Sequence, residues 1–199
     1  MGEKRQARQG ADVLLQEEPL RFQTRKQVGL LGGNFNPVHL AHLVMADQVQ
    51  NQLGLDKVYL MPTYLPPHVD EKKTISSEHR LAMLELAVAD NPCLDIEPIE
   101  LIRKGKSYTY DTMKALKEAN PDTDYYFIIG GDMVEYLPKW HRIDDLLHLV
   151  QFVGIRRPNY PTESTYPIIW VDVPQMAISS TLIRQKVKSG CSTRYLLPE

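Results

Sequence analysis

The sequence predicts an α/β fold in which a doubly wound, mostly parallel sheet carries helices on both faces. Short apolar runs, typical of buried strands, alternate along the chain with longer segments whose apolar residues recur at helical spacing. In the first such unit, a glycine pair at 32–33 separates an apolar run from a helical segment. Strand, glycine turn and helix therefore follow one another from the start of the fold.

The same patterns place the other elements. Asn91-Pro92 and Gly190 are typical helix ends, and Ser76 or Ser77 is a typical helix cap. Strands are expected at 28–31, 57–61, 94–97, 124–129, 150–155 and 168–173, with 99–102 extending the third beyond Pro98. Helices are expected at about 38–54, 76–89, 110–119 and 178–190.

Composition fits one globular domain. The chain has 199 residues, of which 43% are hydrophobic and 24% charged, and two cysteines are too few for a disulfide framework. The net charge of −2 argues against a general nucleic-acid binder, and no apolar run approaches the length of a membrane span. We expect a cytoplasmic protein with a mobile tail over 1–26 and one domain over 27–199; a homo-oligomer is left open.

The glycine turn and the two histidines behind it predict an anion site. Gly32 and Gly33 allow a tight turn and a close approach of a ligand to the backbone. His39 and His42, three positions apart, share one face at the positive end of the following helix. Backbone N–H groups and two imidazoles at a helix start suit a phosphate group.

A second phosphate site is predicted at the last helix, where Ser179, Ser180 and Thr181 stand one turn before Arg184. Gly130-Gly131-Asp132 follows a strand and offers an acceptor for a ribose, and Trp140 offers a flat face for a ring. Other cationic or donor side chains are candidates for an anion. They are His68, Lys72, Lys73 and Arg156.

Together these motifs resemble those of the bacterial nicotinate-nucleotide adenylyltransferases, members of the nucleotidyltransferase superfamily. The histidine pair resembles the superfamily's HxGH signature, with Ala41 where glycine is usual, and 179–184 resembles its Ser-x-Thr-x-x-Arg motif. The segments Ser107-Tyr108-Thr109 and Lys139-Trp140-His141 point to this family within it.

The resemblance implies a Rossmann-like fold and adenylyl transfer from ATP to nicotinic acid mononucleotide, giving deamido-NAD and pyrophosphate. The attack is direct and in line, and Mg²⁺ is held mainly by the ATP phosphates, with no protein metal site. It implies catalytic roles for His39, His42 and Arg184. Members of the family usually have a further C-terminal helix after a Leu-Pro-Glu segment, so we expect this chain, which stops at Glu199, to lack that helix. The implied ATP-binding residues are Gly32, Gly33, Phe35, His39, His42, Gly130, Asp132, Ser179, Ser180 and Arg184, and the implied acceptor-binding residues are Asn36, His68, Lys72, Thr109, Trp140 and Arg156.

The residues leave alternatives open. Another nucleotidyltransferase would accept nicotinamide mononucleotide or phosphopantetheine, or transfer a cytidylyl group. From a different class, the chain could be a nucleotide-binding module without turnover, and Ala41 is the feature that favours this interpretation.

Overall fold

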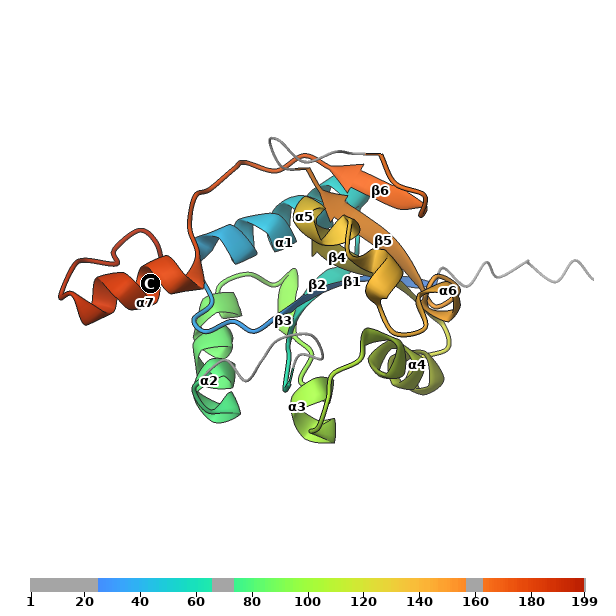
Figure 1. Cartoon of the computed structure of the whole chain (residues 1–199), viewed down its shortest axis with the longest axis horizontal. Helices are drawn as coiled ribbons and strands as arrows, with labels where there is room; N and C mark the ends of the chain where they lie inside the picture. Colours follow the sequence, from blue (N-terminus) through green and yellow to red (C-terminus); the bar gives the residue numbers. More distant parts are fainter. Residues whose placement is uncertain (1–24, 66–73, 157–162, 199) are drawn as a thin grey trace, which may run out of the picture.

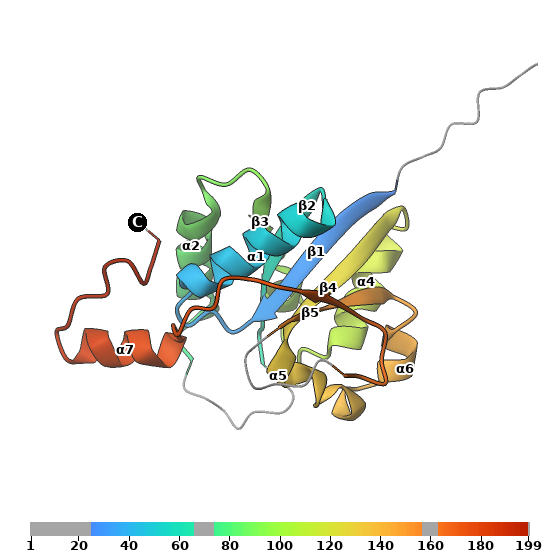
Figure 2. The same ribbon diagram turned by 90° about the horizontal axis from the view of Figure 1, so that it is seen from above.

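A six-stranded, wholly parallel sheet forms the centre of the molecule (Figure 1, Figure 2). The computed structural model describes residues 25–65, 74–156 and 163–198. The strand order is β3-β2-β1-β4-β5-β6. The strands are β1 (Lys26–Gly33), β2 (Lys57–Pro62), β3 (Leu94–Ile96), β4 (Thr123–Gly130), β5 (Val150–Ile155) and β6 (Ile168–Val171).

The helices follow the strands as a parallel sheet requires. Gly54 ends the first helix in the left-handed conformation, and the Ser76 side chain caps the second. The α-helices are α1 (Leu40–Leu53), α2 (Ser77–Val88), α3 (Ile99–Arg103), α4 (Thr109–Ala119), α5 (Gly131–Val134), α6 (Ile143–Leu146) and α7 (Ser180–Lys188), and a 3₁₀ turn covers Leu137–Lys139.

Each face of the sheet has its own apolar core. On one face, Ala46 and Val49 of α1 and Leu84 of α2 pack against alternate strand residues such as Leu60 and Val153. On the other face, α4, α5 and α6 cover the strand residues of the opposite parity, among them Phe127 and Phe152. Because side chains alternate across a strand, these two cores confirm the predicted doubly wound arrangement.

Some expected elements are wrong. Residues 99–102 form α3 and do not extend β3, because Pro98 lacks the N–H that a strand ladder needs and its carbonyl accepts from Ile102 instead. The short helices α5 and α6 were not expected, since four residues show no periodicity. Lys26 belongs to β1, and the Arg25 guanidinium is paired with Asp124 at 2.8 Å, so the predicted tail does not include these two residues.

The strand order places a switch point of the sheet topology at β1, where a ligand can bind at the carboxyl ends of the strands. The connections on either side of β1 run in opposite directions, toward β2 and β3 on one side and toward β4, β5 and β6 on the other. Open α/β sheets bind ligands beyond the carboxyl ends of the strands at such a switch point. Within the described residues, no helix is long and apolar enough to cross a membrane.

Helix α7 stands apart from the layered body in both views (Figure 1, Figure 2). Ile183 is its only buried residue among those described. The helix is attached at its N-terminal end, where the Ser180 hydroxyl donates to the Pro37 carbonyl at 2.7 Å. The following segment also returns to α1, since the Leu40 N–H donates to the Leu196 carbonyl at 3.1 Å.

Candidate active site

A cavity of about 420 Å³ lies at the predicted edge of the sheet. Its floor is formed by the ends of β1 and β4, the two strands at the switch point, and a cavity of this size suits a nucleotide-sized ligand. The lining residues include Gly32, Gly33, Asn34, His42, Thr63, Glu100, Ser107, Tyr108, Thr109, Gly130, Asp132, Met133, Trp140 and His141.

The glycine pair has a different role from the one predicted. Gly32 and Gly33 are the last residues of β1, and neither has a positive φ, so they do not make the turn. The turn comes later, where Phe35 has a φ of 46°, an uncommon value for a residue with a side chain. A Cβ on Gly33 would lie 3.0 Å from the Phe35 ring, so that glycine leaves room for the ring. Space, and not backbone freedom, requires it.

His39 and His42 meet as predicted at the start of α1. Their rings are stacked with centroids 3.7 Å apart. The backbone N–H of His39 donates a hydrogen bond to Nδ1 of His42 at 3.3 Å. His42 lines the cavity, whereas His39 is the buried residue that precedes α1. Since Nδ1 of His42 accepts a hydrogen bond, a neutral His42 carries its proton on Nε2. That N–H is then the donor available to a ligand.

Both imidazoles are neutral at pH 7 without a ligand. Burial, with a smaller effect of the neighbouring His39, lowers the pKa of His42 to about 3. Burial also lowers the pKa of His39 to about 4. Two stacked rings without a nearby carboxylate cannot both be charged at low cost. An anion bound beside them would supply the missing negative charge.

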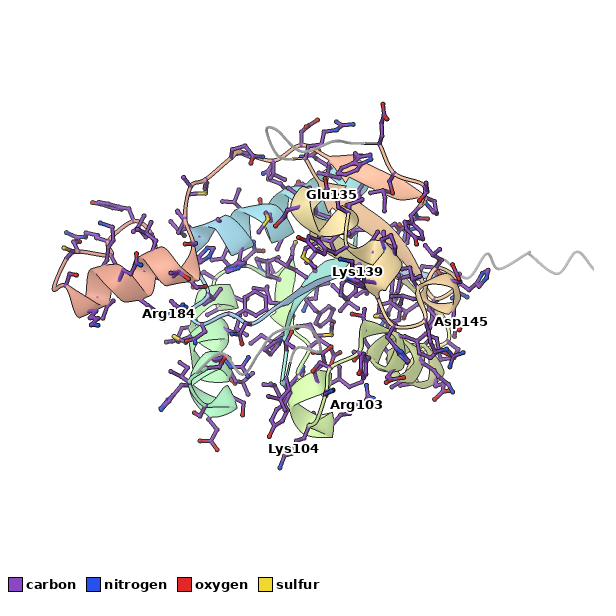
Figure 3. The ribbon with its side chains drawn as sticks, in the orientation of Figure 1. Arg103, Lys104, Glu135, Lys139, Asp145 and Arg184 are labelled. Atoms are coloured by element: carbon purple, nitrogen blue, oxygen red, sulfur yellow. The ribbon has the colours of Figure 1, made fainter. Side chains whose placement is uncertain are left out.

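The second predicted phosphate motif lies next to this histidine pair but outside the cavity lining. Arg184 donates to the Asn36 carbonyl at 2.5 Å and to Oγ1 of Thr181 at 3.1 Å. Ser179 caps α7 by accepting from the Leu182 N–H at 3.2 Å. Figure 3 shows Arg184 where α7 joins the rest of the molecule. The two motifs therefore meet at the loop between β1 and α1.

The residues predicted for the nucleosides line the cavity from several elements. Gly130 ends β4, Asp132 lies in α5, and Thr109 opens α4. Trp140 follows the 3₁₀ turn and is half-buried, with its ring edge-on to Phe127 and Phe152 at 5.9 Å from each. The tryptophan thus packs on the core and also faces the cavity.

Other predicted residues do not line the cavity. Arg156 is exposed directly after β5 and pairs at 2.7 Å with Asp172, directly after β6, so its contact with the acceptor stays a prediction. Phe35 and Asn36 are buried, 2% and 6% exposed, in the loop before α1. Ala41, which stands where the superfamily signature usually has glycine, does not line the cavity either, so its methyl group does not narrow the cavity. His68, Lys72 and Lys73 lie outside the described residues.

Two charged residues at the site were missed in the sequence. Arg80 of α2 is 2% exposed and donates to the loops that follow β1 and β2. Glu100 of α3 is 5% exposed, lines the cavity and accepts from Oγ1 of Thr112 at 3.1 Å. Arg80 had a signal, because it stands four positions before Leu84, on the apolar face of its helix.

Burial raises the pKa of the Glu100 carboxyl, while the hydroxyls of Ser107 and Thr112 act against this shift. The same Ser107 hydroxyl accepts from the Tyr64 N–H at 3.2 Å. Glu100 therefore organises the start of α4, where Thr109 lies, together with the loop that leaves β2.

The chain's relatives identify the class of protein to which this site belongs. Residues 30–186 match the model of the cytidylyltransferase-like family. That range runs from β1 through Arg184, and so includes both phosphate motifs. The chain belongs to this family of nucleotidyltransferases.

Within this class, close relatives of the chain belong to one family. The chain is 63% identical over 183 residues to the probable nicotinate-nucleotide adenylyltransferase of Streptococcus pneumoniae serotype 4, covering 92% of this chain and 88% of that protein. It is 62% identical to the corresponding protein of Streptococcus mutans serotype c, with 92% and 87% covered. The chain belongs to the nicotinate-nucleotide adenylyltransferases, as its motifs predicted.

Solved structures support the fold independently of sequence. Nicotinic acid mononucleotide adenylyltransferase of Plasmodium falciparum, in complex with NaAD, superposes with a TM-score of 0.71 at 19% identity, over 84% of this chain and 87% of that one. A putative nicotinate-nucleotide adenylyltransferase from Vibrio parahaemolyticus gives 0.66 at 18% identity, over 87% and 94%. These structures confirm the Rossmann-like architecture.

Proposed function

We propose that the cavity at the carboxyl ends of β1 and β4 is where this chain carries out its family's reaction, transfer of the adenylyl group of ATP to nicotinic acid mononucleotide. The products are deamido-NAD and pyrophosphate. The observation that carries the proposal is that His42, Asp132, Thr109 and Trp140, from four separate segments, line one cavity at the switch point. Alternative acceptors and a module without turnover are outcomes of the test described below.

The ATP phosphates bind at the start of α1. His42 has its Nε2–H available for a phosphate oxygen, and the N-terminus of a 14-residue helix adds a favourable field. His39 supports this role by fixing the ring of His42 through its N–H and its stacked ring. Gly130 and Asp132 lie across the cavity at the end of β4, where an adenosine ribose would meet them.

Arg184, Ser179 and Ser180 bind the leaving pyrophosphate in this proposal. Without a ligand, the Arg184 guanidinium is held by the Asn36 carbonyl, beside the loop that leads to His39. A carbonyl is a weaker partner for a guanidinium than a phosphate, so the pyrophosphate would compete for it. The anchored start of α7 keeps the arginine close to the site.

The acceptor lies beside the start of α4 and Trp140, away from the ATP phosphates at the start of α1. Thr109 and Trp140 contact the nicotinate ring, and the backbone amides near Trp140 bind its carboxylate. Asn36, His68 and Lys72 are proposed near the mononucleotide phosphate. Thr109 opens α4, an 11-residue helix whose first N–H groups favour an anion.

The chemistry needs alignment and charge neutralisation. The attacking phosphate oxygen is already ionised at neutral pH, so no general base is required, and attack on the α-phosphate expels pyrophosphate in line. Histidine and arginine donors stabilise the charge that gathers on the transferred and leaving groups. Mg²⁺ enters with ATP, held by phosphate oxygens and water.

One assay tests the proposal. The protein is given ATP and Mg²⁺ with nicotinic acid mononucleotide, nicotinamide mononucleotide or phosphopantetheine in parallel, and pyrophosphate and product are measured. Release with nicotinic acid mononucleotide, well above the other two, is the expected result. Turnover with another acceptor would reassign the substrate, and binding of ATP without turnover would make the chain a nucleotide-binding module.

A further inference from the structure

Arg80 is the most deeply buried cationic side chain among the described residues, at 2% exposure. Its Nη1 donates to three acceptors: the Thr63 carbonyl at 2.7 Å, the Asn34 carbonyl at 3.0 Å and the Asn34 side-chain oxygen at 3.3 Å. Asn34 and Thr63 follow β1 and β2, and both line the cavity. One guanidinium of α2 therefore joins the two loops that form this wall.

The charge of Arg80 is balanced by oxygen dipoles. Within the described ranges, no carboxylate forms an ion pair with it, and its Nε is buried without a hydrogen-bond partner. Burial accordingly lowers the pKa of the guanidinium, although arginine keeps its charge. Burying a cation of this kind lowers the stability of the fold, and a leucine at this position would stabilise it more.

The Thr63–Tyr64 peptide is held on both sides. Its carbonyl accepts from Arg80, and its N–H donates to Oγ of Ser107 at 3.2 Å. The preceding N–H, of Thr63, donates to the Gly33 carbonyl at 2.9 Å. Three cavity-lining segments, after β1, after β2 and before α4, are thereby fixed to one another through the backbone of Thr63 and Tyr64.

We propose that Arg80 is a positioning residue for the acceptor mononucleotide, acting through Asn34 and Thr63. The proposal rests on the proposed function. The wall that these two residues form is joined through the Tyr64 N–H to Ser107, in the segment that leads to Thr109, which we assign to the acceptor. Gly130 and Asp132, which we assign to ATP, come instead from the end of β4 and from α5. The positive charge of Arg80, which forms no ion pair with a carboxylate of the described residues, also favours an anionic ligand at this wall.

The test compares Arg80→Lys and Arg80→Met with the same two changes at Arg25. Arg25 is the matched control because it precedes β1, at the amino edge of the sheet, away from the cavity. For each variant, kcat and KM are measured with each substrate varied in turn, together with Tm. Arg80→Met is expected to raise the acceptor KM about 10-fold or more while the ATP KM changes less than about threefold. Arg80→Lys should raise the acceptor KM less than Arg80→Met does, because lysine keeps the positive charge but not the planar guanidinium.

Hydrogen exchange gives a readout that does not need turnover. In Arg80→Met, the amides of Thr63 and Tyr64 should exchange faster, with the amides of β4 and β5 unchanged. Equal KM changes for both substrates, exchange that rises throughout the sheet, or failure of both Arg80 variants to fold would make Arg80 a structural residue and overturn the inference. If the wild type shows no turnover, the proposed function fails. The amide exchange then still reports whether Arg80 fixes the wall.

Discussion

The guanidinium of Arg184 donates a hydrogen bond to the backbone carbonyl of Asn36, 148 positions away in the chain. Asn36 lies three residues before His39, so this contact joins the two phosphate motifs predicted at opposite ends of the sequence. The Ser180 hydroxyl reinforces it by donating to the neighbouring Pro37 carbonyl. The imidazoles and the guanidinium that we propose to bind the ATP phosphates therefore lie around one loop.

His42→Ala is expected to lower kcat by about 100-fold or more while leaving the fold intact, because it removes a donor aimed at the charge that develops on phosphate. Pyrophosphate release measures the effect, and circular dichroism checks the fold. His79→Ala is the matched control, since His79 is an exposed histidine of α2. Turnover of His42→Ala close to that of the control would remove His42 from the mechanism.

The histidine pair should make the ligand-free protein lose stability as the pH falls. Both folded pKa values lie below that of a free histidine, so between about pH 6.5 and pH 4 the unfolded chain binds protons that the folded chain does not. The free energy of unfolding therefore decreases as the pH drops through this window, by at most about 2 kcal/mol per histidine at pH 5.

Thermal melts from pH 7.5 to pH 4.5 check this expectation, with His42→Gln as the comparison. Glutamine does not titrate, so the variant should lose less stability over the same range than the wild type. Parallel melting curves for the two proteins would contradict the assignment of the pH dependence to His42.

Trp140→Ala should raise the KM for the mononucleotide more than that for ATP, because the ring lines the cavity where we propose that the acceptor binds. The residue also packs on Phe127 and Phe152, so Tm should fall as well. Trp140→Phe separates the two effects, since phenylalanine keeps most of the packing and a flat face. An unchanged acceptor KM in Trp140→Ala would show that the tryptophan is structural.

Glu100→Gln should be as stable as the wild type or more stable above neutral pH, by about 1 kcal/mol. Burial raises the pKa of Glu100, so the folded chain binds a proton more tightly than the unfolded chain. Stability therefore decreases as the pH rises from about 4.5 through the folded pKa. Glutamine removes this dependence. Melts from pH 4.5 to pH 8.5 measure it.

Glu118→Gln is the control for that series, because the side chain of Glu118 on α4 is 68% exposed. Its melting curve should follow the wild type across the range. A Glu100→Gln protein that is less stable than the wild type at pH 8 would mean that the hydrogen bond to Thr112 outweighs the cost of burying the carboxylate.

Much of the candidate site was visible in the sequence because its signals are local. A glycine pair before two histidines three positions apart, and a serine before an arginine one helical turn later, each specify a helix start by themselves. The roles of Gly32 and Gly33 could not be read in the same way. Whether a glycine supplies a turn or leaves room for a ring depends on Phe35 and on the strand register.

Arg156 and Arg80 show most clearly what could not be predicted from the sequence. From the sequence, Arg156 is a candidate for binding an anion, and Arg80 has no assigned role. Arg156 meets Asp172 across the edge of the sheet, and Arg80 meets two carbonyls inside it. The position of Arg80 on the apolar face of α2 indicates burial, but these partners are distant in sequence, so no local pattern identifies them.

The sequence by itself determined the alternation of strands and helices, both phosphate motifs and the family, because hydrophobic period, caps and short motifs depend on neighbouring residues. Only the tertiary structure decided that β1 lies between β2 and β4, that α7 returns to the loop before α1, and that Arg80 and Glu100 hold the cavity wall. These features arise from packing both faces of one sheet, and packing joins residues that no spacing along the chain relates.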